Sequence, residues 1–188
     1  MKLIILDRDG VINFDSDHYI KSADEWKPIP GSLEAIALFN QNGYRVAVAT
    51  NQSGVGRGLF DMQTLNAMHD KMHRLTAAQG GHIDAVFYCP HTPEEKCGCR
   101  KPKAGMFTAI AQRFSVDLQT VYAVGDSARD IVAAASVGCT PVLVRTGKGE
   151  KTFANGDLPE GTLVFADLLS AAQAITQDRN AGQQTRHA

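Results

Sequence analysis

Residues 3–10 read Leu3-Ile4-Ile5-Leu6-Asp7-Arg8-Asp9-Gly10, four apolar residues that run directly into two aspartates and a glycine. An apolar run of this length without polar alternation is typical of a parallel strand that is buried on both faces. The glycine permits a sharp turn straight after the strand. We therefore expect Asp7 and Asp9 at the carboxyl end of a buried strand, the edge of an α/β sheet at which ligands bind.

Short apolar, β-branched runs alternate with longer helical patterns along the rest of the chain. We predict strands over Leu3–Leu6, Val46–Thr50, Ala85–Tyr88, Val121–Val124, Pro141–Val144 and Thr162–Phe165. Helices are predicted over residues 31–42, 61–79, 104–115, 128–137 and 166–177, the second capped by Asp61. This alternation predicts an α/β fold with a doubly wound, mainly parallel, Rossmann-like sheet.

Length and composition indicate one soluble domain. We expect a single domain over residues 1–176, with a polar, flexible tail over 177–188. Residues 10–30, 54–60 and 89–103 interrupt the alternation and are expected to be short loops that cover the site. The formal net charge of -1 argues against nucleic-acid and membrane partners. With no spanning segment or signal peptide recognised, we expect a cytoplasmic monomer.

A second acidic motif follows the predicted strand at Val121–Val124. Gly125-Asp126 comes directly after that strand, and Asp130 lies one helical turn further on. A single aspartate after a strand is more often a cap or a turn residue. Several aspartates at converging strand ends repel one another and need a cation, and hard oxygen ligands favour Mg²⁺. We therefore expect a magnesium site at this edge of the sheet.

Two further segments carry groups that suit a phosphate. Residues 50–54, Thr50-Asn51-Gln52-Ser53-Gly54, end the second predicted strand with hydroxyls, amides and free backbone N–H groups. Alone they are ordinary turn residues. Arg100-Lys101-Pro102 precedes a predicted helix, and the Lys101 ammonium would neutralise both a carboxylate nucleophile and a phosphate.

Three cysteines and a histidine lie within eleven residues. In a reducing compartment such a cluster indicates a metal site, and four nitrogen and sulfur ligands fit a closed tetrahedral zinc site. With no open coordination position, the zinc is expected to be structural and to direct Arg100 and Lys101 into the active site. The expected ligands are Cys89, His91, Cys97 and Cys99.

Three other residues of metal-binding type have simpler interpretations. Cys139 precedes a predicted strand and is expected to be a small buried residue. His69 and His73 are spaced as a metal pair on a helix, but no third ligand is near them in the sequence. We expect both histidines on a solvated helix face.

Taken together, these motifs resemble the haloacid-dehalogenase-like superfamily of phosphatases. Its four motifs are present in order: Asp7-x-Asp9-Gly10, Thr50, Lys101, and Gly125-Asp126 with Asp130. The resemblance implies that Asp7 attacks phosphorus and that Asp9 acts as general acid and base, while Thr50 and Lys101 bind the phosphoryl oxygens. It also implies that Mg²⁺ is held by Asp7, the Asp9 carbonyl and Asp126, with Asp130 in support.

A narrower resemblance points to the branch of heptose-bisphosphate and histidinol-phosphate phosphatases, with the same zinc loop. Gly54-x-Gly56-Arg57-Gly58 and Val142–Lys148 favour the heptose enzymes, which act on the 7-phosphate in the supply of ADP-heptose for lipopolysaccharide. Histidinol phosphate is the alternative substrate. The resemblance implies substrate contacts from Asp15, Tyr19, Asn51, Gln52, Ser53, Arg57 and Arg100. Two departures are the segment Asp15–Tyr19, one residue longer and without the usual glycine, and Ser127, where some relatives have lysine.

Two functions of other classes also fit parts of the sequence. A phosphorylatable receiver-like switch uses an acidic pocket with Mg²⁺, but it has no need of Asp9 two residues after Asp7 or of a zinc loop beside Lys101. A zinc-stabilised binding module without catalysis would not need Asp7, Asp9 and Lys101 together. Phosphate release from a simple ester distinguishes a phosphatase from both.

Overall fold

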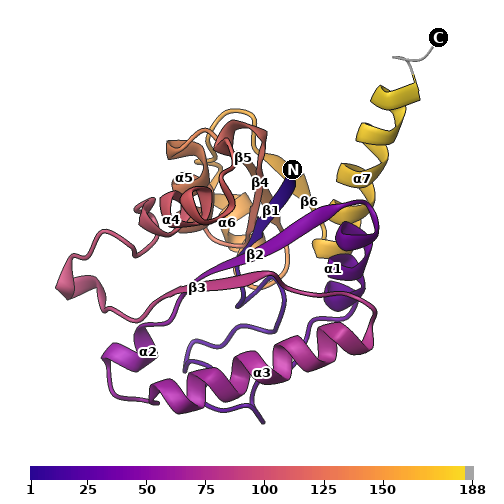
Figure 1. Cartoon of the computed structure of the whole chain (residues 1–188). Coiled ribbons are helices and arrows are strands. Elements are labelled where there is room, and N and C mark those ends of the chain that lie inside the picture. The colour runs from indigo at the N-terminus through magenta and orange to yellow at the C-terminus, as the bar shows by residue number, and fades with distance from the viewer. Residues whose placement is uncertain (185–188) are drawn as a thin grey trace.

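The computed structural model of the chain describes residues 1–184, with the side chains of residues 1–177. Its centre is a six-stranded parallel sheet in the order β3-β2-β1-β4-β5-β6 (Figure 1). The predicted doubly wound α/β fold and all six predicted strands are confirmed. The strands are Lys2–Leu6 (β1), Tyr44–Asn51 (β2), Ala85–Cys89 (β3), Tyr122–Gly125 (β4), Thr140–Val144 (β5) and Leu163–Phe165 (β6).

All five predicted helices are present, together with shorter ones that helical periodicity could not reveal. The α-helices are Ser32–Gln41 (α1), Ser53–Gly56 (α2), Met62–Ala78 (α3), Gly105–Phe114 (α4), Ala128–Ser136 (α5), Gly149–Asn155 (α6) and Leu168–Gln184 (α7). Two 3₁₀ turns cover Pro93–Glu95 (η1) and Leu118–Thr120 (η2). Within the described part of the chain, no helix has the length and apolar character that a bilayer crossing requires.

The last helix is longer than we expected. Residues 177–184, assigned to a polar tail, continue α7 to Gln184, and only residues 185–188 of that tail lie outside the described part of the chain. The stretch holds good helix formers (glutamine, arginine and alanine) beside the poor ones Asp178, Asn180 and Gly182.

The sheet is covered on both faces, and strand β1 contributes to both cores. Leu3 and Ile5 pack into the core on the side of α4 and α5, whereas Ile4 and Leu6 pack into the core that includes α1, α3 and α7. The strand alternates between the two faces, as the period of two requires. The uninterrupted apolar run at the N-terminus therefore belongs to a strand that is buried on both faces.

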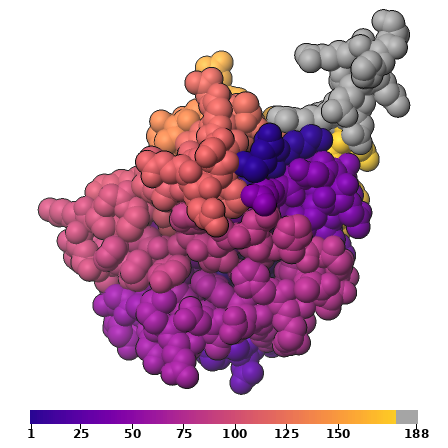
Figure 2. Space-filling model, viewed as in Figure 1, coloured from indigo at the N-terminus to yellow at the C-terminus, as the bar shows by residue number. Residues whose placement is uncertain are grey.

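The strand order brings the predicted catalytic segments together. Strand β1 lies between β2 and β4, and Leu6 is in register with Val48 on one side and Val124 on the other. The residues just beyond these positions thus meet at one edge of the sheet. Beyond β3, the segment from Pro90 to Lys103 projects from the molecule on the left of the view in Figure 2.

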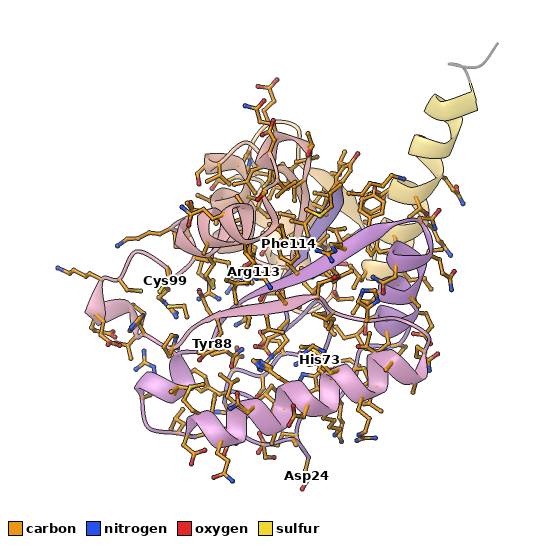
Figure 3. All side chains as sticks on the ribbon, viewed as in Figure 1. Asp24, His73, Tyr88, Cys99, Arg113 and Phe114 are labelled. Atoms are coloured by element: carbon orange, nitrogen blue, oxygen red, sulfur yellow. The ribbon has the colours of Figure 1, made fainter. Side chains whose placement is uncertain are left out.

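The first covering loop, residues 10–30, is fixed against α3. The Lys71 ammonium donates hydrogen bonds to the carbonyl oxygens of Ala23 (2.6 Å) and Trp26 (2.8 Å). The Trp26 side chain is fully buried, while Asp24 points away beyond α3 (Figure 3). One charged side chain therefore connects the helix to the loop that covers the site.

Replacing Lys71 by Met should loosen this loop, because it keeps the apolar stem but leaves two partly enclosed carbonyls without their donor. We expect a loss of about 1–3 kcal/mol in the free energy of unfolding, measured by urea denaturation. Amide hydrogen exchange should accelerate in residues 20–27. The exposed Lys151 on α6 provides the control. Lys151→Met should change stability by less than about 0.5 kcal/mol, and an equal loss in both variants would contradict the assignment.

Candidate active site

Three carboxylates converge at the carboxyl edge of the sheet. Asp7 follows β1, Asp126 follows β4, and Asp130 lies in the first turn of α5. One oxygen of each lies within 4.8 Å of the others. They border a cavity of about 190 Å³ that is lined by Asp7, Asp9, Asp15, Ser16, Asp17, Tyr19, Ile20, Thr50, Asn51, Gln52, Ser53, Arg100, Lys101, Asp126, Arg129, Asp130 and Lys148.

The Lys101 ammonium compensates the negative charge of this group. Lys101 is 2 % exposed, and its Nζ lies 2.9 Å from Asp7 Oδ1 and 2.6 Å from Asp130 Oδ1. It donates a third hydrogen bond to the carbonyl of Ala49 (2.7 Å). An ammonium has three donors, so all three are engaged.

Asn51 fixes the main chain that carries this lysine. Its side-chain Oδ1 accepts from the Lys101 N–H, and its Nδ2 donates to the Lys101 carbonyl, both at 3.1 Å. Asn51 lines the cavity, as expected of a substrate contact, but its amide is already engaged in holding Lys101. Positioning of the lysine is therefore the role that its contacts define.

The electrostatics of the site favour a proton or a cation at Asp7 and Asp126. Burial, reinforced by the Asp130 charge, raises the pKa of Asp7 to about 7 despite Lys101. Burial together with Asp130 and Asp7 raises the pKa of Asp126 to about 8. Burial acts in the same direction on Asp130, but Lys101 and the hydrogen bonds from Ser127 together outweigh it and hold the pKa of Asp130 below its usual range. An oxygen-ligand set with this much uncompensated charge suits Mg²⁺.

Two glycines allow the chain to approach Asp126 closely. Gly10 (φ 82°) and Gly147 (φ 58°) adopt left-handed conformations, and a Cβ on either would collide with the Asp126 carboxylate. The backbone N–H of Lys148 donates to Asp126 Oδ2 (2.7 Å), and Thr146 Oγ1 donates to the Gly10 carbonyl (2.6 Å). The turn 146–148 is thus part of the site. We had not predicted this, although it directly follows strand β5.

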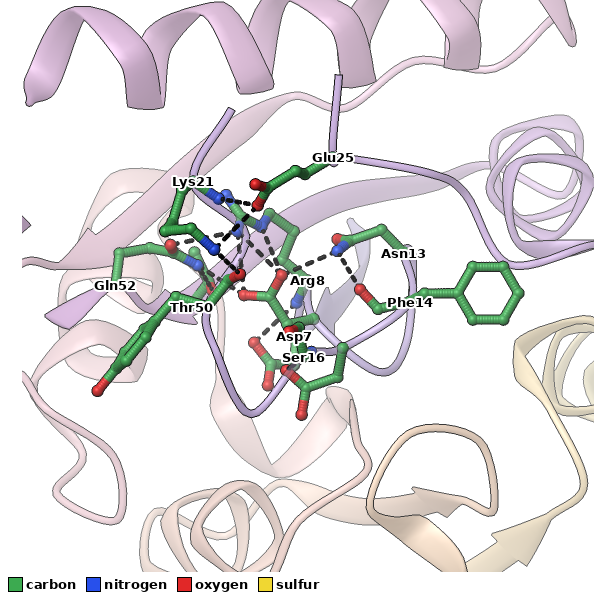
Figure 4. A network of polar contacts seen from close by, with 12 residues as sticks. Asp7, Arg8, Asn13, Phe14, Ser16, Lys21, Glu25, Thr50 and Gln52 are labelled. Carbon is green, nitrogen blue, oxygen red and sulfur yellow. Dashed lines mark hydrogen bonds and ion pairs between the residues drawn. The ribbon is translucent and has the colours of Figure 1, made fainter. Parts of the chain in front are cut away.

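Asp9 is held by a network centred on Arg8. Arg8, Asn13, Thr50 and Gln52 of this network are labelled in Figure 4. The Arg8 guanidinium is fully buried, and its Nη2 lies 2.9 Å from Asp9 Oδ1 and 3.1 Å from Oδ2. Asn13 Nδ2 donates to Asp9 Oδ1 (2.8 Å), and Gln52 Nε2 donates to Asp9 Oδ2 (2.7 Å) and to Thr50 Oγ1 (2.9 Å). Burial alone would raise the pKa of Asp9, but these partners outweigh it and lower that pKa. No pattern in the sequence indicated the role of Arg8.

The expectation for His69 was wrong, whereas that for His73 holds. His69 is only 8 % exposed, and its Nε2 lies 3.4 Å from Arg8 Nη1. His73 is exposed on the same helix. The error has a simple cause: His69 lies four residues after Leu65 and next to Met68 on the buried stripe of α3. The apolar spacing of that stripe was a signal that could have identified it.

The predicted substrate contacts divide into two groups. Asp15, Tyr19, Gln52, Ser53 and Arg100 line the cavity, and Asp15 pairs with Lys148 (3.0 Å). Arg57 does not line it. Its guanidinium points instead towards Glu94, at 3.9 Å, because it follows the short helix α2 in an exposed glycine-rich loop.

The cysteines of the projecting loop form a compact cluster with His91. Cys89 Sγ lies 3.6 Å from Cys97 Sγ and 3.3 Å from Cys99 Sγ, and His91 Nδ1 lies 3.3 Å from Cys99 Sγ. Tetrahedral zinc with Zn–S bonds of about 2.3 Å separates its sulfur ligands by about 3.8 Å, so the donor set fits a zinc ion. Cys99 is labelled in this loop in Figure 3. Cys139 is buried away from the cluster, as expected.

Comparisons with known proteins agree with this geometry. A family model described as HAD-hydrolase-like matches residues 98–171. A Bordetella bronchiseptica protein named D-glycero-beta-D-manno-heptose-1,7-bisphosphate 7-phosphatase is 60% identical over 95% of this chain and 99% of its own. The Neisseria meningitidis serogroup B protein of that name is 53% identical over 97% and 99%. The chain therefore belongs to the family of these heptose-bisphosphate phosphatases.

Solved structures of the family have the same fold. The D,D-heptose 1,7-bisphosphate phosphatase from B. bronchiseptica, in complex with magnesium and phosphate, matches with a TM-score of 0.93 at 60% identity and covers 95% of this chain and 99% of its own. The enzyme from Burkholderia thailandensis matches with a TM-score of 0.76 at 55% identity, covering 93% and 98%. The resemblance inferred from the sequence motifs is thereby confirmed.

The raised pKa values of Asp7 and Asp126 predict that the Mg²⁺-free protein becomes less stable as the pH rises. These carboxyls have an ordinary pKa of 3.8, but folding raises the values to about 7 and about 8. The folded chain binds more protons between these limits, so the free energy of unfolding falls across this window. Because Mg²⁺ binds the ionised carboxylates, it should raise Tm more at about pH 8 than at about pH 5.

This effect can be measured by circular dichroism on protein that has been freed of Mg²⁺ by gel filtration, with the cysteine cluster left as purified. Asp126→Asn should reduce both the pH dependence and the response to Mg²⁺. The control is Asp70→Asn, an exposed residue on α3, which should leave both unchanged. An equal effect of Mg²⁺ on Tm at both pH values would contradict the interpretation.

Proposed function

We propose that this chain removes the 7-phosphate of D-glycero-beta-D-manno-heptose 1,7-bisphosphate in a Mg²⁺-dependent reaction. The observation that carries the proposal is the pairing of Asp7 with the buried Lys101 at 2.9 Å, in a cavity that Asp9, Thr50 and Asp126 also line. The names of relatives with 53–60% identity over nearly the whole chain support the substrate. The product would enter the supply of ADP-heptose for lipopolysaccharide.

Asp7 is the nucleophile of the proposed reaction. Its Oδ1 accepts hydrogen bonds from the Arg8 backbone N–H (2.7 Å) and from Lys101, which fixes the carboxylate and leaves Oδ2 to attack. The new bond joins this oxygen to phosphorus, and the bond from phosphorus to the sugar oxygen breaks. The product of this step is an aspartyl-phosphate and a sugar alkoxide that needs a proton.

Asp9 supplies that proton and then reverses its role. In its protonated form it donates to the leaving oxygen, and the resulting carboxylate takes a proton from the water that hydrolyses the aspartyl-phosphate. Gln52 connects Asp9 with Thr50, so the acid/base group and a phosphate-binding hydroxyl share one hydrogen-bonding partner. A receiver-like switch, which keeps its aspartyl-phosphate, would have no use for this arrangement.

Lys101 and Thr50 bind the transferring phosphoryl group. Since all three donors of Lys101 are engaged, a phosphoryl oxygen has to take the place of one acceptor. Asp7 is the acceptor whose charge falls when its carboxylate becomes an acyl phosphate, whereas Asp130 and Ala49 keep the ammonium in place. The reaction itself thus frees a Lys101 hydrogen for the phosphate.

The cluster of carboxylates at this edge fits Mg²⁺. We assign the metal to the Asp7 and Asp126 carboxylates together with the Asp9 backbone carbonyl. Asp130 supports the site through Lys101 and through Ser127 (Oγ to Oδ2, 2.6 Å). When bound, Mg²⁺ neutralises negative charge and keeps the phosphoryl group in line with Asp7.

The cluster of Cys89, His91, Cys97 and Cys99 is proposed to bind structural Zn²⁺. Cys99 immediately precedes Arg100 and Lys101, so fixing the cluster fixes the start of the segment that carries the catalytic ammonium. Arg100 Nη1 also donates to the His91 carbonyl (3.3 Å), which ties the arginine to the same loop. The proposed metal therefore acts through the position of Lys101 and not through chemistry at phosphorus.

The substrate is tested by phosphate release in the presence of Mg²⁺. We expect kcat/KM for the heptose bisphosphate to exceed that for histidinol phosphate and fructose 1,6-bisphosphate by at least ~100-fold. Asp7→Asn keeps the shape but removes the nucleophilic charge, and should lower kcat by at least ~10³-fold. A preference for histidinol phosphate would overturn the substrate, and appreciable turnover by Asp7→Asn would overturn the nucleophile.

Replacing Cys97 by Ser should release zinc and loosen the segment that follows it. We expect a loss of about one zinc per chain, measured by elemental analysis, together with a fall in kcat, because Lys101 is no longer held against Asp7. The matched control is Cys139→Ala, which removes a buried thiol outside the cluster and should leave the zinc content unchanged. Full retention of zinc and activity by Cys97→Ser would refute the assignment.

A further inference from the structure

His69 is a buried histidine to which the proposed reaction assigns no step. Its Nε2 lies 3.4 Å from Nη1 of the fully buried Arg8. A guanidinium has only donors, so the His69 nitrogen has to accept, and the ring then carries its proton on Nδ1. Burial, together with the Arg8 charge, lowers the pKa of His69 to about 4, consistent with a neutral ring.

The opposite side of the same guanidinium holds Asp9. Arg8 Nε and Nη2 lie 3.2 and 2.9 Å from Asp9 Oδ1, and Nη2 is also 3.2 Å from Gln52 Oε1. Arg8 therefore bridges a histidine on α3 and a carboxylate at the end of β1. Neither His69 nor Arg8 is among the described residues that line the cavity.

We propose that His69 and Arg8 are positioning residues for the acid/base group of the reaction. His69 holds the Arg8 guanidinium, and the guanidinium holds the Asp9 carboxylate in the orientation that proton transfer requires. This inference rests on the function proposed above, because it gives these residues a role only if Asp9 transfers protons.

The dependence on His69 follows from the burial of Arg8. Without His69, Arg8 Nη1 would be a buried donor without this acceptor, and an unpaired buried donor is costly. The guanidinium would turn or admit water to satisfy that donor, and its hydrogen bonds to Asp9 would weaken. Gln52 and Asn13 would still contact Asp9, so we expect impaired proton transfer and not complete loss of it.

The leaving group reveals whether the defect lies in proton transfer. A sugar alkoxide needs a proton as it departs, whereas p-nitrophenolate leaves readily without one. Loss of Asp9 orientation should therefore slow aspartyl-phosphate formation from a sugar phosphate but not from p-nitrophenyl phosphate. Thr50 and Lys101 bind phosphate without His69, so KM should be unaffected.

The experiment compares three variants of the full chain with both esters and Mg²⁺. His69→Leu removes the acceptor, His69→Gln keeps one near the position of Nε2, and His73→Leu is the control on the exposed face of the same helix. For His69→Leu we expect kcat on the heptose bisphosphate to fall about tenfold at constant KM, with the single-turnover release of p-nitrophenolate unchanged. His69→Gln should recover most of the loss, and His73→Leu should match the wild type.

Equal losses on both esters with a raised KM would show a merely structural role and overturn the proposal, as would full activity of His69→Leu. Nitrogen NMR of the wild type provides a test that needs neither turnover nor a variant that folds: a proton on Nε2 of His69 would also overturn it. If the wild type releases phosphate from the heptose bisphosphate, the proposed function stands whatever the His69 variants do. If it hydrolyses neither ester, that function fails and the positioning role with it.

Discussion

The ammonium of Lys101 lies within 3 Å of two carboxylates, Asp7 at 2.9 Å and Asp130 at 2.6 Å, and the arrangement of the site follows from that charge compensation. Enclosed carboxylates are stable only when opposite charge or hydrogen-bond donors accompany them. The lysine comes from neither β1 nor β4, the strands that the acids follow. It is supplied by the segment after β3, and the cysteine cluster lies directly before it in the sequence. The projecting loop, residues 90–103, therefore contributes to the candidate site together with the strands.

Asp7 and Arg8, the two residues that directly follow β1, contact different groups on opposite sides of this edge. Asp7 belongs to the group around Lys101, while Arg8 turns into the protein and meets Asp9, Gln52 and His69. The proposed nucleophile and the proposed acid/base group, only two residues apart, thus have separate environments. The pKa of Asp7 is raised and that of Asp9 is lowered. Without a cation these shifts run against the proposed roles, because a nucleophile has to be ionised and a general acid protonated; a bound Mg²⁺ would favour the ionised form of Asp7.

Much of the fold and of the site's composition could be predicted from the sequence, because both follow from local patterns. Apolar runs located all six strands, and parallel strands necessarily bring Asp7, Thr50 and Asp126 to the same edge. The direction of single side chains could not be predicted in this way. Arg8 lies between two acids without any periodic signal, and Arg57 lies in a loop whose course depends on where the cysteine segment packs. His69 is a different case. The apolar stripe of α3 indicated that it is buried, but we interpreted it together with His73, which is exposed.

The glycines that border Asp126 affect how substitutions in this chain should be interpreted. Gly10 and Gly147 present no side chain to substrate, and a survey of contact residues would pass over both. Yet the space that a Cβ would need at either position is already filled by the Asp126 carboxylate. In genetic terms, a missense change at Gly10 or Gly147 belongs with changes in the proposed catalytic aspartates, and not with the tolerated variation of surface loops.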